Sequence, residues 1–366
     1  MNIELMTALG QLEREKGISK EIILDALEAA LIKAYNRHFD AADNVRVHVD
    51  RRTGQVQVYA SKTVVENVTE PHYEISLEEA TQRNPDYELD DVVEEEVTPK
   101  DFGRIAAQTA KQVVMQRLRE AQRGMIFEEY ASREGEIING IVQRFESRSV
   151  VVDLGKTEAL LLPNEQMPTE NYRFGDRIKT YIVEVKRTSK GPQIMLSRTH
   201  PGLVKRMFEL EVPEIGDGTV EIKAVAREAG SRSKVAVFSR DPNVDAVGSC
   251  VGPKGMRVQT VVSELKGEKI DIVEWSLDPE QLVANALSPS RVVLVTCDQT
   301  EKVARVIVPD HQLSLAIGKE GQNVRLAARL TGWKIDIKSE SQARSGQTAG
   351  VFVGQEEEEE DDVNEE

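Results

Sequence analysis

The chain has 366 residues, of which 30% are charged and 5% aromatic, and its formal net charge is −16. This length exceeds what one compact core usually contains, so we expect two to four domains. So few aromatic side chains favour several small domains over one large enzyme.

The acidic balance is uneven along the chain. Residues 1–130 have 25 acidic and 16 basic side chains, residues 131–338 have 28 and 30, and residues 339–366 have ten and one. The net charges are therefore −9, +2 and −9. The middle of the chain is the part whose charge permits close contact with phosphates.

Cysteine and histidine usage argues against disulfides and metal sites. Cys250 and Cys297 form no C-x-x-C pair, and the five histidines lack ligand spacing, so we expect no metal and no cofactor. The N-terminus lacks the apolar core of a signal peptide, and no run approaches the roughly 20 apolar residues that span a bilayer. We therefore expect a cytoplasmic protein without membrane contact.

Helical periodicity opens the first region. Apolar residues recur on one face of residues 1–16 and again from Ile22 to Ala34, which predicts two amphipathic helices. The β-rich runs Val45–Val49 and Val56–Val65 predict a hairpin. A stripe of apolar residues predicts a long helix from about residue 102 to residue 129, so this region is expected to form an α/β domain.

From Gly135 the apolar period changes to two. Five short runs separated by Gly-containing turns predict a small closed barrel of the OB type. The expected strands are 136–145, 150–154, 158–162, 177–186 and 193–197.

The next part of the chain contains an internal repeat. Val251–Gly255 is matched by Ile317–Gly321 at an offset of 66, and Lys269–Ile272 is matched by Lys334–Ile337 at an offset of 65. The same elements recur around each glycine motif in the order α-β-β-α-α-β. The repeat therefore predicts two tandem domains of one fold.

Each copy contains a G-x-x-G motif between two helices. Without Cβ atoms, the glycines let a nucleic-acid backbone approach, and the helix that follows directs unpaired N–H groups at phosphate. KH domains clamp about four nucleotides of single-stranded RNA in this way. A lone G-x-x-G is more often a tight turn, but two copies in register favour RNA binding. The predicted RNA-binding residues are Gly252, Pro253, Lys254, Gly255 and Arg257 in the first copy and Gly318, Lys319, Glu320, Gly321, Arg325 and Arg329 in the second.

The two loops differ in charge. Lys254 gives the first loop one cation, whereas Lys319 and Glu320 nearly cancel in the second. We therefore expect the second loop to depend on backbone N–H groups and on Arg325 and Arg329. For each of these cations taken singly, an ordinary solvated surface charge is an equal alternative. Apolar residues beside the loops are expected to provide a floor for the bases, namely Val251, Val258, Ile317 and Val324.

The barrel is a weaker candidate for RNA contact. Single-strand surfaces combine stacking aromatic rings with basic side chains, which makes Arg144, Phe145, Arg148 and Lys156 candidates. Phe145, however, alternates with Ile137 and Ile141, which favours a place in the core. The barrel is then a weak binder or a spacer.

These patterns divide the chain into five parts, and the last is an acidic tail. Nine of the eleven residues from Glu356 to Glu366 are acidic, which predicts disorder through self-repulsion. A solubility tail and a competitor for the RNA surface are both open interpretations. The expected domains are 1–130, 134–200 (the barrel), 201–277 and 278–340 (the two copies), and 341–366 (the tail).

The chain as a whole resembles the NusA family of transcription termination and antitermination factors. The barrel is similar to an S1 domain, the repeat to tandem type II KH domains, and the first region to the polymerase-binding domain. These similarities rest on Val152–Gly155, Gly175–Asp176, Ile194–Arg198, Val258–Val262, Gly267–Ile272, Val306–Asp310 and the Phe102–Arg123 helix. Some members continue into C-terminal acidic repeat domains, and this chain resembles a short form without them.

The resemblance implies a non-enzymatic factor. Residues 1–130 are expected to bind RNA polymerase, and the S1 and KH domains to hold single-stranded nascent RNA, so that pausing, hairpin-dependent termination and antitermination are modulated. We expect a monomer, and contacts with other antitermination factors stay open.

Two other classes of protein remain as alternatives. The sequence contains no P-loop, metal-spaced histidine pair or nucleophile motif, which disfavours an RNA-processing enzyme. Phosphate- or magnesium-dependent loss of RNA would indicate such an enzyme. A ribosome-associated RNA chaperone is the second alternative, and it would not copurify with polymerase.

Overall fold

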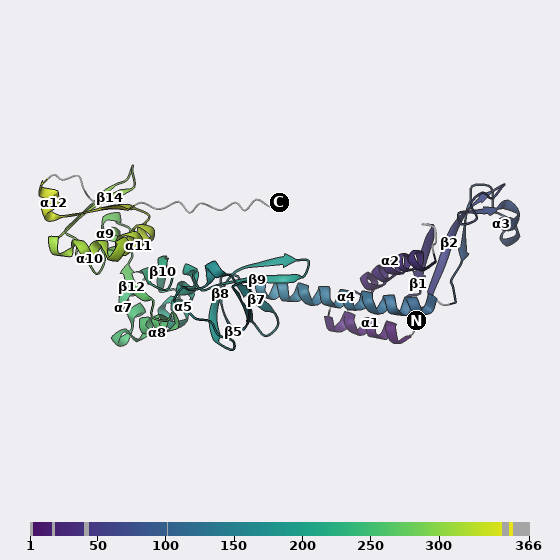
Figure 1. Ribbon diagram of the computed structural model, residues 1–366, viewed down its shortest axis with the longest axis horizontal. Coiled ribbons are helices and arrows are strands. Elements are labelled where there is room, and N and C mark those ends of the chain that lie inside the picture. The colour runs from purple at the N-terminus through teal and green to yellow at the C-terminus, as the bar shows by residue number, and fades with distance from the viewer. Residues whose placement is uncertain (1–2, 17–18, 40–43, 101, 346–350, 354–366) are drawn as a thin grey trace. The chain divides into compact units, whose positions relative to one another are not determined.

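The computed structural model describes residues 3–16, 19–39, 44–100, 102–345 and 351–353 (Figure 1). The chain divides into two compact units, residues 1–126 and residues 127–366. Helix α4 (Phe102–Ala131) begins in the first unit and ends in the second.

The first unit packs helices against a four-stranded sheet. Strand β2 lies in the middle and pairs antiparallel with β1 and β4 and parallel with β3. Leu27 and Leu31 of α2 are buried with Val47 of β1 and Phe102 of α4 in one core. The elements are α1 (Ile3–Lys16), α2 (Lys20–Phe39), β1 (Val45–Val49), β2 (Val56–Val65), β3 (Glu74–Ser76), α3 (Leu77–Arg83) and β4 (Val92–Glu96).

The second unit begins with a closed barrel. Its strands are joined in the order β5-β6-β7-β9-β8. Alternate residues point inward, and Val150, Val152, Ile182, Ile194 and Leu196 are fully buried. The strands are β5 (Ile137–Glu146), β6 (Ser149–Asp153), β7 (Glu158–Leu161), β8 (Arg177–Thr188) and β9 (Gly191–Ser197), with a 3₁₀ turn at Pro163–Glu165.

Two repeats of the same fold follow, here called the first and the second repeat. In each, the first two strands pair antiparallel and the last strand is parallel to the second. The first repeat contains α5 (Pro201–Glu211), α6 (Pro213–Gly216), β10 (Val220–Glu228), β11 (Arg232–Ser239), α7 (Ala246–Val251), α8 (Met256–Glu264) and β12 (Lys269–Glu274). The second contains α9 (Pro279–Ala286), β13 (Leu294–Asp298), β14 (Val303–Val308), α10 (Leu313–Ile317), α11 (Gln322–Thr331), β15 (Lys334–Ser339), α12 (Glu340–Ser345) and β16 (Val351–Val353).

A buried arginine directly after the last barrel strand joins the barrel to the first repeat. The Arg198 guanidinium pairs with the carboxylate of Glu170. It also donates to the backbone oxygen of Lys179 in β8 at 2.7 Å and to that of Glu264 in α8 at 3.1 Å. One side chain therefore fixes a barrel strand and the end of a helix of the first repeat in the same place.

A second buried arginine binds the backbone just after the first. Both side chains of the Arg227–Glu268 pair are almost fully buried, at 1% and 0% exposure. The two groups form a bidentate pair with both N–O distances at 2.9 Å, and Arg227 also donates to the backbone oxygen of His200 at 2.9 Å. Ser233 and Gly230 donate to the same carboxylate. Because every charged atom has partners, the pair can be accommodated away from water.

The two repeats contact each other through the start of α11. Glu228, at the end of β10, accepts hydrogen bonds from Gln322 and Arg325, both at 2.7 Å. Lys234 is buried nearby and donates to the backbone oxygen of Ser288 at 2.8 Å. Burial lowers the pKa of Lys234 to about 8, although the Asp271 carboxylate opposes that shift. The helix behind the second glycine loop is thus held against the first repeat.

The structure corrects the expectation that Phe145 belongs to the core. Ile138 and Val142 of β5 face the barrel interior, and a register shift between Val142 and Arg144 then interrupts the alternation, so that Phe145 lies opposite Val150 near the end of the strand. Phe145 is 53% exposed. The prediction assumed an unbroken alternation along the strand, and the bulge breaks it before Phe145.

The structure also corrects the predicted extent of the tail. Residues 340–345 form α12, and Val351–Val353 pair antiparallel with β15 as a fourth strand of the second sheet. The run Val-Phe-Val has high β-propensity in an otherwise polar segment, and the free edge of β15 accepts it. The acidic run from Glu356 onward lies outside the described residues.

We predict that Arg227→Met destabilises the first repeat by about 3–5 kcal/mol, because Glu268 would remain buried without its charged partner. Urea unfolding, with hydrogen exchange of the β10 and β12 amides, measures this change. The control is Arg133→Met, which removes a solvent-exposed pair with Glu136. The expectation would be wrong if both substitutions altered exchange in these strands equally.

Candidate nucleic-acid interface

The two glycine loops have the same backbone conformation. Gly252 and Gly318 adopt φ of 70° and 77° with ψ of 174° in both. Gly255 and Gly321 are left-handed, each with φ of 75°. The residue before them, Lys254 or Glu320, is also left-handed, with φ of 53° or 54°. The loop geometry therefore does not depend on whether its tip is basic or acidic.

The first and second glycines of each loop have different roles. A Cβ added to Gly318 would lie 2.8 Å from the backbone nitrogen of Asn323, and one added to Gly252 would lie 2.7 Å from Cγ of Arg257. At Gly255 and Gly321 an added Cβ would meet nothing within 4 Å. The first glycine is thus required by the packing inside the loop, whereas the second keeps the outer surface of the loop open.

A side chain five residues after the first glycine supports each loop from behind. Arg257 donates to the backbone oxygen of Ser249 at 2.6 Å and to Glu214 at 2.9 Å. Asn323, at the matching position, is buried and donates to the oxygens of Ala316 at 3.0 Å and Leu287 at 3.1 Å. Arg257, predicted to contact RNA, thus already holds two partners beneath the loop.

The helices behind the loops direct backbone donors toward the loop. Gly255 and Gly321 are the N-caps of α8 and α11, and no side-chain cap bond forms at either of these two positions. The first N–H group of each helix, that of Met256 or Gln322, bonds to the backbone oxygen of Pro253 or Lys319. The donors left for phosphate oxygens are those that follow in the first turn.

The charged residues of the two loops are placed differently. Lys254 is exposed at the tip of the first loop. Lys319 and Glu320 are exposed and lie 3.9 Å apart in the second loop, which leaves that tip nearly neutral. Arg325 pairs with Glu228 of the first repeat at 2.7 Å, while Arg329 is exposed on the outer face of α11.

The apolar floor predicted beside the loops is only partly present. Val251, Val258 and Ile317 are half-buried, so part of each side chain reaches the surface. Val324 is fully buried in the core of the second repeat. The matching position in the first loop, Val258, therefore differs from it in exposure.

The four barrel candidates do not form one basic surface. Arg144 binds Glu158 through two hydrogen bonds of 2.6 and 2.7 Å, and this carboxylate raises the pKa of the guanidinium. Lys156 pairs with Glu129 at 2.7 Å. Phe145 and Arg148 are exposed. Two of the four are thus already neutralised by carboxylates.

Within the described part of the chain, no group of three or more His, Cys, Asp or Glu side chains is placed to hold a metal ion. Cys250 and Cys297 are both free thiols. Among the described helices, none is both long and apolar enough to cross a bilayer.

Four family models match the chain in consecutive order. They are the NusA N-terminal domain at residues 4–124, the S1 RNA binding domain at 132–197, the NusA-like first KH domain at 198–275 and the NusA-like second KH domain at 279–345. The two glycine loops lie inside the two KH matches.

Curated relatives match over almost the whole chain. A protein of Halalkalibacterium halodurans named transcription termination/antitermination protein NusA is 67% identical over 94% of this chain and 90% of its own length. The proteins of that name from Bacillus subtilis and Thermus thermophilus are 65% and 44% identical, and each match covers at least 90% of both chains. The solution structure of the Bacillus subtilis NusA N-terminal domain is 63% identical, with a TM-score of 0.31, over 34% of this chain and 99% of that one.

We predict that Gly318→Ala lowers the free energy of unfolding of the second repeat by about 2–4 kcal/mol, because it combines a clash with a conformation that is essentially restricted to glycine. Gly321 is also left-handed, but an added Cβ would meet no neighbouring atom there, so Gly321→Ala should cost only about 1 kcal/mol. Urea unfolding of the two full-length variants measures the difference. Equal losses would contradict the separate roles of the two glycines.

Proposed function

The chain belongs to the NusA family, and on that premise we propose that it is an RNA-binding transcription factor that also docks on RNA polymerase. Its second unit holds the emerging transcript, and its first unit, residues 1–126, makes the polymerase contact. The protein then modulates pausing, hairpin-dependent termination and antitermination in the cytoplasm.

The observation that best supports RNA binding is the duplicated loop. Both loops combine an open left-handed glycine with an uncapped helix N-terminus. A phosphate backbone requires such a surface, because it must approach main-chain donors without meeting a Cβ. The predicted contacts that fit this geometry best are Gly252–Gly255, Gly318–Gly321 and the exposed Arg329.

A factor of this kind needs no bond-making step. If polymerase holds the first unit, the RNA sites stay near the transcript at a high effective concentration, so individually weak contacts suffice. Stabilising a nascent hairpin by one to two kcal/mol would change a pause lifetime roughly five- to thirtyfold.

We predict that Gly255→Asp and Gly321→Asp each weaken binding of single-stranded RNA by roughly tenfold, because each places a carboxylate where phosphate would lie. Fluorescence anisotropy with the full chain at fixed salt measures the affinity. Gly332→Asp is the matched control, since Gly332 is also left-handed (φ 74°) and open but lies at the other end of α11. RNA affinity that survives both loop substitutions would argue against the loops as the RNA site.

We predict that a chain beginning at residue 127 no longer copurifies with core RNA polymerase, whereas the full chain does, because the polymerase contact lies in the first unit. The truncated chain should still bind single-stranded RNA, which serves as the control for folding. Capture of the truncated chain by polymerase at the level of the full chain would contradict this assignment and place the contact in the second unit.

A further inference from the structure

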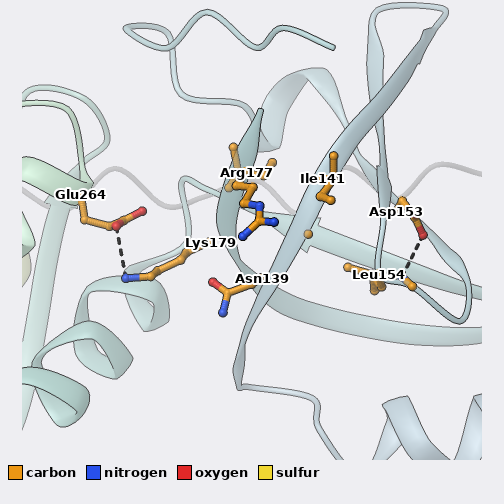
Figure 2. Close-up of a pocket in the computed structure, with 10 residues that line it drawn as sticks. Asn139, Ile141, Asp153, Leu154, Arg177, Lys179 and Glu264 are labelled. Atoms are coloured by element: carbon orange, nitrogen blue, oxygen red, sulfur yellow. Dashed lines mark hydrogen bonds and ion pairs between the residues drawn. The ribbon is translucent and has the colours of Figure 1, made fainter. Parts of the chain in front are cut away.

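A pocket lies on the barrel surface where the barrel meets the first repeat. Its volume is about 610 Å³. Figure 2 shows Asn139, Arg177 and Lys179 around its middle, with Glu264 of α8 on one side and Asp153 and Leu154 on the other. The lining thus comes from three strands of the barrel and one helix of the first repeat.

The strand register brings four of these side chains together. Asn139 lies opposite Lys179, and Ile141 lies opposite Arg177, on neighbouring strands β5 and β8. Outward-facing residues of paired strands form a compact group on one face. Ile141 is 41% exposed although it is apolar. The group therefore offers a cation, an amide and an apolar surface to one ligand.

Arg177 is the cation that remains available in this group. Lys179 and Glu264 neutralise each other at an N–O distance of 3.2 Å. Asp153 accepts a hydrogen bond from the backbone of Gly155 at 2.8 Å. Among the described residues, no carboxylate pairs with Arg177. Its exposed guanidinium can therefore bind an oxyanion with two parallel hydrogen bonds.

The pocket is held in shape from below. Arg198 is buried and donates to the backbone oxygens of Lys179 and Glu264, the two residues that form the ion pair at the pocket edge. The two sides of the pocket thus cannot separate without breaking a buried hydrogen-bond network.

Helix α8 connects this pocket with the first glycine loop. It begins directly after Gly255 and ends at Glu264, nine residues later. At 1.5 Å per residue, the two sites lie about 13 Å apart along the helix, a span that about four stacked nucleotides cover. An RNA strand clamped at the first loop is therefore long enough to reach the pocket.

We propose that this pocket binds a nucleotide of single-stranded RNA beyond the part that the first loop clamps. Arg177 holds its phosphate, the apolar side chains of Ile141 and Leu154 contact the base, and the Asn139 amide can donate and accept at the base edge. The proposal rests on the RNA binding proposed above and adds a second contact to the same strand.

The test compares two RNA lengths. An RNA of about 4 nucleotides fills one loop, whereas one of about 12 also reaches the pocket. Arg177→Ala in the full chain should weaken binding of the longer RNA about five- to tenfold, leave the shorter RNA unchanged and reduce the salt slope by about 0.7. Asn139→Asp, which places a negative charge in the pocket without changing its shape, should give the same length dependence. Both side chains are exposed, so neither change should disturb folding.

Arg173→Ala is the matched control, because Arg173 is an exposed arginine close in sequence that does not line the pocket. The proposal is overturned if Arg177→Ala has no effect, acts equally on both lengths or matches the control. Failure of the proposed RNA-binding function would be seen separately. In that case the substitutions at Gly255 and Gly321 would leave the affinity for both RNAs unchanged.

Discussion

The arrangement of the second unit depends on two buried guanidinium groups. Arg198 and Arg227 lie where the barrel ends and the first repeat begins, and each pairs with a carboxylate. Arg198 also donates to main-chain oxygens of two separate elements, and Arg227 donates to the main-chain oxygen of His200. A buried guanidinium can occupy few other positions, because a shift that breaks one of its hydrogen bonds leaves the charge without a partner in a low-dielectric site. The position of α8 relative to the barrel, and with it the distance from loop to pocket, follows from this constraint.

The repeat shows that one backbone geometry can be supported by different side chains. Arg257 and Asn323 occupy the same place behind the two loops, yet one is a charged group paired with Glu214 and the other a buried amide. The glycine conformations are nearly identical in both. The main-chain conformation is therefore what the two loops share, while their tips differ in charge. The backbone contacts common to both loops can clamp RNA without reading its bases.

Local patterns were sufficient for much of this fold, and non-local packing explains what they missed. The hairpin Val45–Val65 and the two copies of the glycine loop follow from periodicity and spacing. Phe145 was misplaced because a bulge between Val142 and Arg144 interrupts the alternation, and no local pattern marks that bulge. Asn323 was overlooked although the 66-residue offset aligns it with Arg257. Residues 139, 177 and 264 meet only in three dimensions, so no sequence motif indicates the pocket.

A main-chain clamp has a consequence for specificity. Contacts to phosphate position a strand, whereas sequence preference requires hydrogen bonds to base edges. The second loop is nearly neutral and the first has one exposed lysine, so neither presents a side chain suited to distinguish bases. Asn139 in the pocket has both a donor and an acceptor and lies beside the cation that would hold the phosphate. If the loops and the pocket bind RNA as proposed, affinity comes mainly from the loops and discrimination between bases comes from Asn139 in the barrel.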